Sequence, residues 1–334
     1  MPYKSSFLRP GAVTGLVGDA ETALHYGDVS AEVRALREGV GVVDLAWRGV
    51  VEVTGRDRVR FLNGMCTNDV KALKPGQGCM AAVVNRQGKM IAEIVVRAVE
   101  NALLLEVDRS NLQAATEALR KFVVADDVAF TASEAAVAGV YGPGAGGFLQ
   151  AGPLAEFDTV RRGEVLVSRT RELGVEGYHL LVPASRPEEP GLILAHGGTP
   201  VGFEAWESLR ILNGFPRWGV DMGPDVLPME AGLEPIAISY TKGCYIGQEV
   251  IQRVKTYSEP TRMLVSLELP GLAVPAPGAA ISAGGHEVGH VTSVTTGRAL
   301  GYVRKEQKAD GTAVTIAPGL PAVVRPLPWR ASAT

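Results

Sequence analysis

The sequence predicts an α+β protein that ends in a small β-barrel. Helix-like and strand-like patterns alternate irregularly through the first 259 residues, whereas short β-branched runs between glycine and proline turns follow Pro260. The chain also has 40 glycines and 21 prolines, which suits many tight connections. We therefore expect a mixed body over residues 1–259 and a separate barrel over residues 260–334.

The elements of the body can be assigned in order along the chain. A helix over residues 28–39 opens at a capping aspartate and ends at Gly39. Apolar runs bounded by turn residues predict strands over 50–55, 78–84, 90–99, 103–107, 136–141, 165–168 and 178–182, the last two pairing around Gly174. Further helices are expected over 56–64, from Ser110 or Asn111 to Val123, over 204–212 before Gly214, and from Gln248 onward.

Composition excludes some classes of function. The net charge of −3 provides no overall attraction to nucleic acid or to an anionic membrane, so we expect neither as a direct partner. No stretch has the length of a membrane span, and Met1–Ser6 is not followed by the apolar core of a signal peptide. Cys66, Cys79 and Cys244 form no CxxC pair, which predicts a reducing, cytoplasmic setting without a thiolate zinc site.

Two motifs match functional patterns in the wrong context. His286–His290 reads HEVGH, but the zinc motif requires a helix, and the flanking glycines and β-branched residues predict a strand. In a strand the two histidines lie roughly 13 Å apart, too far to share a metal. Gly142–Gly147 satisfies GxGxxG without a surrounding series of parallel strands. We expect neither a metal site nor a dinucleotide site.

The segment Lys242–Glu249, KGCYIGQE, is the strongest candidate for chemistry and is called the octapeptide below. Lys242 lies two residues before Cys244, so in an extended segment both side chains would share one face, and the ammonium would favour the thiolate. A helix that opens at Gln248 would add its partly positive end. We predict a reactive thiol at Cys244, with a buried packing role as the alternative.

The octapeptide matches the KGC(Y/F)xGQE signature at every position, and the chain resembles the YgfZ branch of the folate-binding superfamily that includes the glycine-cleavage T-protein (GcvT). Other segments match in the family's order: Gly41–Leu45, Gly55–Asp57, Phe61–Gly64, Cys66–Asp69, Glu207–Ile211, Gly214–Pro216, Leu227–Leu233 and Gly289–Ser293. The resemblance implies a three-lobed, cloverleaf-like body of two interleaved subdomains around a folate cleft, closed by the barrel. It also implies tetrahydrofolate, or a one-carbon derivative, as the ligand.

The resemblance also implies roles for individual residues. Asn68, Asp69, Glu93, Arg210, Tyr245 and Gln248 are the implied folate-binding residues, and Cys244, Lys242 and Glu249 are the implied catalytic residues. A polar pocket with cations at its mouth would suit a pterin ring and its anionic tail. A capped turn is the alternative for Asn68 and Asp69, and an ion pair is the alternative for Arg210.

The chain departs from the T-protein pattern at two acidic segments. The paired-acid segment GGxxDDL corresponds to Gly88–Ile94, with Ala92 and Glu93 at the acidic positions. The segment TGExGY corresponds to Leu173–Tyr178, with Val175 at the position of the pterin-binding glutamate. Both departures argue against ordinary aminomethyl transfer, which needs a positioned carboxylate.

The function implied is therefore that of a YgfZ-like protein. Such a protein binds a tetrahydrofolate and supports iron–sulfur cluster assembly or repair in other enzymes, including enzymes of tRNA modification. Its expected partners are iron–sulfur proteins or cluster-assembly factors, and the resemblance suggests a monomer. One alternative is a folate-dependent aminomethyltransferase, methyltransferase or demethylase using Glu93 and Asp69. Another is a folate-binding adaptor that performs no chemistry.

Overall fold

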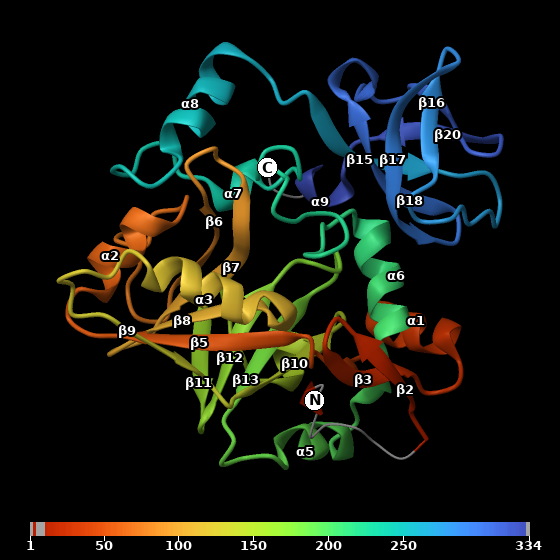
Figure 1. Ribbon diagram of the computed structural model, residues 1–334. Helices are drawn as coiled ribbons and strands as arrows, with labels where there is room; N and C mark the ends of the chain where they lie inside the picture. The colour runs from red at the N-terminus through yellow and green to blue at the C-terminus, as the bar shows by residue number, and fades with distance from the viewer. Residues whose placement is uncertain (1–2, 5–10, 332–334) are drawn as a thin grey trace.

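The computed structural model describes residues 3–4 and 11–331 of the chain. Figure 1 shows a mixed body with the barrel at one end, and helix α6 (Phe203–Asn213) lies beside the barrel. Two large sheets form the centre of the body. The predicted α+β fold with a C-terminal barrel is confirmed.

One central sheet has five strands in the order β6-β7-β8-β5-β9. Helices α2 (Arg58–Met65) and α3 (Leu112–Arg120) pack on one face, burying Leu62 and Leu119 among the strand side chains. A 3₁₀ turn over Arg109–Asn111 precedes α3 and is capped by Asp108. The strands are β5 Arg48–Thr54, β6 Gly78–Val84, β7 Met90–Ala98, β8 Leu103–Asp108 and β9 Ala129–Ala132.

The other central sheet has the order β11-β12-β13-β10-β4-β14, and among its neighbouring strands only β4 and β14 pair in parallel in the described structure. Strands β12 and β13 form the hairpin predicted around Gly174. The glycine run after β10 enters the short helix α4 (Ala145–Phe148), but β10 pairs antiparallel with both of its neighbours, β13 and β4, so the parallel-strand context of a dinucleotide site is missing. The strands are β4 Gly41–Asp44, β10 Ala136–Tyr141, β11 Thr159–Arg162, β12 Val165–Thr170, β13 Gly177–Val182 and β14 Thr199–Val201.

The N-terminal region adds a small sheet that the sequence did not predict. It contains β1 (Tyr3–Lys4), β3 (Ala20–His25) and β2 (Val13–Val17) in that order. The next element, α1 (Val29–Glu38), was predicted correctly. The Asp28 carboxylate caps it by accepting from the Ala31 amide, and it ends at Gly39.

The C-terminal strands close into a six-stranded barrel in the order β15-β18-β17-β16-β19-β20. The HEVGH motif lies at the start of a strand, β17, which confirms that it is not a helical zinc motif. The barrel strands are β15 Arg262–Glu268, β16 Ala280–Ala283, β17 His286–Thr295, β18 Arg298–Arg304, β19 Ala313–Ile316 and β20 Leu320–Arg325.

The remaining helices connect these units or flank them. Helix α8 (Gln248–Tyr257) begins at the residue predicted from the sequence. The others are α5 Glu189–Ala195, α7 Glu234–Ala237, α9 Pro328–Ala331 and a 3₁₀ turn over Lys305–Gln307. Within residues 3–4 and 11–331, no helix combines the length and apolar character that a membrane span requires.

Candidate functional site

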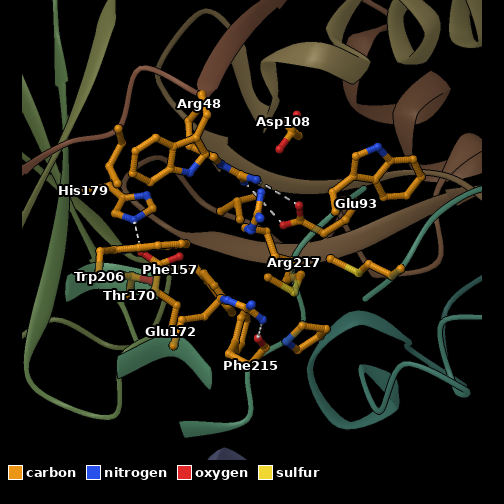
Figure 2. Close-up of a pocket in the computed structure, with 18 of the residues that line it drawn as sticks. Arg48, Glu93, Asp108, Phe157, Thr170, Glu172, His179, Trp206, Phe215 and Arg217 are labelled. Atoms are coloured by element: carbon orange, nitrogen blue, oxygen red, sulfur yellow. Dashed lines mark hydrogen bonds and ion pairs between the residues drawn. The ribbon is translucent and has the colours of Figure 1, made fainter. Parts of the chain in front are cut away.

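A narrow cavity lies between the two central sheets and the segment 215–222. Its volume is about 40 Å³, room for a group of a few heavy atoms. Its aromatic walls are Trp47, Phe157, Trp206, Phe215 and Trp218, and its charged side chains include Arg48, Glu93, Arg97, Asp108, Glu172 and His179. Figure 2 shows Arg48 and Glu93 on one side of this cavity, with His179 and Glu172 on the other.

The charged side chains form one buried network centred on Glu106 of β8. The Glu106 carboxylate accepts from Arg48 Nε at 2.8 Å and from Arg97 Nη2 at 2.7 Å. It also lies 3.0 Å from Nδ1 of His179, which belongs to the opposite sheet. Two further carboxylates complete the network, Glu93 at 3.1 Å from Arg48 Nη1 and Glu172 at 2.7 Å from His179 Nε2. The network therefore links the two sheets across the cavity.

The network changes the proton affinities of its members. Burial alone would lower the pKa of His179, but Glu106 and Glu172 outweigh it and raise that pKa to about 9. Burial alone would raise the pKa of Glu106, yet His179, Arg97 and Arg48 hold it well below its usual range. For Glu93, burial outweighs Arg48, and its pKa is raised. Glu93 is thus a carboxyl group in the cavity that retains a proton more readily than usual.

Arg97 contributes more donors to the cavity than the protein uses. Its side chain is 2% exposed, and its one hydrogen bond in the described structure joins Nη2 to Glu106. Nε and Nη1 are buried there without any partner. Buried donors are almost always paired, so these atoms mark a site where an acceptor is missing.

The octapeptide forms a second candidate site, held against the loop that follows α2. The Lys242 ammonium donates to the carbonyls of Asn63, Cys66 and Asn68 at 2.5, 2.8 and 2.7 Å. It also lies 5.0 Å from the centre of the Tyr245 ring, which is buried. Burial lowers the pKa of Lys242 and raises that of Tyr245 to about 12. Lys242 therefore fastens the octapeptide to the Asn63–Asn68 loop.

Cys244 occupies a different environment from Lys242. The cysteine is exposed, whereas the lysine is 8% exposed, so the two do not share the face expected of an extended segment. The octapeptide is irregular rather than a strand up to Gln248, which is why the alternation fails. The lysine charge instead acts on Cys66, where burial still dominates and raises the thiol pKa. Cys244 faces solvent and is not among the residues that line the cavity.

Asn68 and Asp69 form a tight turn beneath the octapeptide. The Asn68 side-chain amide donates to the carbonyls of Met80 and Ile236, and its oxygen accepts from the Asp69 amide. The Asp69 carboxylate accepts from the Ala72 amide. These bonds match the capped-turn alternative, and neither residue lines the cavity.

Arg210 lines the cavity, but its N–H groups donate to other groups of the protein. Its guanidinium bonds to Glu207, Asp221, the Phe215 carbonyl and Ser293, and these bonds engage every N–H group that an arginine has. Asp221 also accepts from Thr292 and Ser293 of β17. Arg210 therefore fixes α6 and the segment 215–222 to the barrel, and no donor is left for a ligand.

The predicted site residues thus divide between two places. Glu93 and Arg210 line the cavity, whereas Lys242, Cys244, Tyr245, Asn68 and Asp69 lie at or beneath the octapeptide. Gln248 is half-buried at the start of α8, and Glu249 beside it is exposed.

Sequence reasoning missed Arg97, Glu106, Glu172 and His179. Three of them interrupt apolar strands, and a charge within such a run indicates a buried partner or a ligand. No group of three or more histidine, cysteine or acidic side chains among the described residues is arranged to hold a metal ion.

Comparison with known proteins assigns the family. Residues 4–242 match the GCVT N-terminal domain, and residues 262–331 match the CAF17 C-terminal β-barrel domain. An Arabidopsis thaliana chloroplastic protein named "Putative transferase" is 31% identical over 99% of this chain and 81% of its own length. An aminomethyltransferase of Shouchella clausii is 30% identical over 94% of this chain and 90% of its own.

The fold has a close structural counterpart. The glycine cleavage system aminomethyltransferase T of Bartonella henselae superposes with a TM-score of 0.87, at 24% identity, over 96% of this chain and 94% of that one. The chain therefore belongs to the GcvT family and carries a C-terminal barrel of the CAF17 type.

Proposed function

We propose that this protein is a YgfZ-like member of the family, which binds a tetrahydrofolate and supports iron–sulfur cluster assembly or repair through Cys244. The observation that carries the proposal is the exposed thiol of Cys244 on a segment that is otherwise fastened to the body. The partners would be iron–sulfur proteins or cluster-assembly factors, including those of tRNA-modifying enzymes. A cytoplasmic location and a monomeric state stay predictions.

The octapeptide is built as a fixed support for that thiol. Lys242 fastens one side, and the Ile246 amide donates to the Gly64 carbonyl at 3.2 Å. Gly247 has a φ of +80°, and a Cβ there would lie 2.4 Å from the Asn85 carbonyl oxygen. Gly243, beside the cysteine, faces open space. A thiol held in this way is available to a large partner rather than to the narrow cavity.

The surroundings of Cys244 suit a temporary ligand rather than a permanent cluster site. The described residues offer no group of three or more metal-ligating side chains, so a cluster contacting Cys244 would take its remaining ligands from the partner. The cluster would then be cargo, held during transfer. A solvent-facing thiol meets that requirement because the partner can approach it directly.

The cavity has the chemistry that a reduced folate requires. Arg97 offers buried donors, Glu93 and Glu172 offer acceptors, and the aromatic walls match a flat ring. At about 40 Å³ the cavity admits a few heavy atoms, so a whole pterin would require lining side chains to move. Glu93 would meet the polar edge of the ring, and the folate would supply one-carbon chemistry.

Complementation of a YgfZ-deficient strain tests the proposal. We expect Cys244→Ala to abolish rescue while leaving the thermal midpoint within about 2 °C of wild type, since surface substitutions have small effects. Cys79→Ala is the matched control, because that thiol is only partly exposed within the β6 strand, and it should rescue fully. Full rescue by Cys244→Ala would remove the thiol from the function.

A folate-dependent transferase or demethylase is the second candidate, and Glu93 is the observation that favours it. This carboxyl group lines the cavity with a raised pKa, as proton transfer near neutral pH requires. Asp69, its expected companion, does not line the cavity, so Glu93 would act alone. Turnover of tetrahydrofolate with candidate methyl donors would support this candidate if it survives Cys244→Ala and is lost in Glu93→Gln.

A further inference from the structure

The interior of the cavity contains a cation with unused donors. Arg97 stands on β7 with its side chain 2% exposed, and it lines the cavity. Its Nε and Nη1 atoms have no partner in the described structure. We propose that Arg97 is a ligand-recognition residue that donates from these atoms to an uncharged carbonyl oxygen of a planar ligand. This inference rests on the proposed folate binding and specifies one contact of that site.

The two unpartnered donors of Arg97 reduce the stability of the free protein. A buried donor without an acceptor loses its hydration and gains nothing in return. Glu106 does not need Arg97, because Arg48 and His179 bond to the same carboxylate. Stability therefore gives no reason to keep the unused donors. Groups that are costly in the free protein are a recognised feature of binding sites.

The charges around Arg97 favour a neutral acceptor over an anion. The cations Arg48, Arg97 and His179 face the carboxylates Glu93, Glu106 and Glu172 in the network, and Asp108 adds a further carboxylate to the lining. Three further arginines line the cavity, but Arg210 is paired with Glu207 and Asp221, and Arg217 is paired with Glu207. The third, Arg169, donates to the Leu154 carbonyl. With these ion-pair partners counted, the cavity wall presents as many carboxylates as cations, so a free carboxylate would gain no net attraction. A carbonyl oxygen accepts from the guanidinium without adding a negative charge to this balance. Two carbonyls of a folate could supply it, the 4-oxo group of the pterin or the amide beyond the ring.

Binding of tetrahydrofolate and of tetrahydroaminopterin, which has an amino group in place of the 4-oxo group, tests the assignment. Isothermal titration under anaerobic conditions would compare full-length wild type with Arg97→Met and Arg97→Lys. We expect Arg97→Met to weaken tetrahydrofolate binding at least about tenfold, as for a lost bond to a charged donor. Its thermal midpoint should stay level or rise, because the unpartnered donors are gone. Arg262→Met, at an arginine outside the cavity lining, is the control and should bind within twofold of wild type.

Each outcome decides a different point. If wild type prefers tetrahydrofolate and Arg97→Met loses that preference, the acceptor is the 4-oxo group. If Arg97→Met weakens both ligands equally at an unchanged midpoint, the acceptor is elsewhere on the folate. Equal binding by wild type and Arg97→Met overturns the inference alone. A lower midpoint in Arg97→Met, restored together with binding by Arg97→Lys, assigns Arg97 to structure and also overturns it. If wild type binds neither ligand, the folate function itself fails.

Discussion

His179 Nδ1 lies 3.0 Å from Glu106 Oε1, although the two residues belong to different sheets. The other ring nitrogen of His179 contacts Glu172, so the imidazole is held between two carboxylates. A charged imidazole in this position joins the sheets at the cavity. This contact makes the packing of the body depend on the protonation of one histidine.

Stability should therefore fall as the solution becomes alkaline. The folded-state pKa of His179, about 9, lies above its ordinary 6.5, so its contribution is fully present below pH 6.5. This stabilising contribution is lost as pH rises through about 9. The difference between the two pKa values corresponds to roughly 3 kcal/mol of stability. Urea unfolding from pH 6 to 10 should show wild type losing stability relative to His179→Gln. Parallel curves for the two proteins would show that the imidazole is not charged in the fold.

Alkylation should separate the three thiols by rate. Cys244 is exposed, while burial raises the pKa of Cys66 and of Cys79. We expect iodoacetamide to modify one thiol rapidly in the native protein and all three after unfolding. Mass spectrometry of wild type and Cys244→Ser would identify the fast thiol. A fast phase that persists in Cys244→Ser would contradict the exposure of this cysteine.

The two glycines of the octapeptide should respond differently to alanine. At Gly247 the φ is +80° and the new Cβ would meet the Asn85 carbonyl, so we expect a loss of about 1–3 kcal/mol. Gly243 has no atom within 4 Å of an added Cβ, and its substitution should be nearly neutral. Chemical denaturation of both variants checks the contrast. Equal effects would mean that the octapeptide is not packed on the β6–β7 turn.

Arg210 should be important for stability. Arg210→Met would leave the Asp221 carboxylate, which is 0% exposed, without its cation, and we expect a loss of about 3–5 kcal/mol. Arg325 also contacts two carboxylates, but at the surface, so Arg325→Met should have little effect on stability. Thermal unfolding measures both. If Arg210→Met unfolds like wild type but loses folate affinity, Arg210 has the ligand role that the family resemblance implies.

Local patterns predicted much of the secondary structure. Asp28 and Gly39 delimit α1 because each forms a hydrogen bond with a backbone group within four residues. The HEVGH motif was also predictable, because the glycines next to it favour a strand and turn over a helix. The N-terminal sheet was missed. Its β2 strand exposes Val13 and Leu16, so it lacks the half-buried alternation that identifies a strand.

The candidate sites were less predictable because their contacts join distant parts of the chain. Lys242 bonds to carbonyls 174 to 179 residues away, and local spacing pointed it toward Cys244 instead. Glu106 meets His179 only once the two sheets pack, 73 residues apart in sequence. Arg210 was a reasonable ligand candidate, since sequence could not show that Asp221 and the barrel occupy its donors.

The bonds of Asp221 determine whether the barrel is a separable module. Its carboxylate accepts from Thr292 and Ser293, and its carbonyl accepts from the Tyr302 hydroxyl at 2.7 Å, all from barrel strands. Truncation after Glu259 would remove these donors and open a buried ion pair to water beside the cavity wall. The barrel thus completes the interior of the preceding body. A body produced without it would lack the hydrogen-bond donors of Asp221 at the surface that the barrel covers.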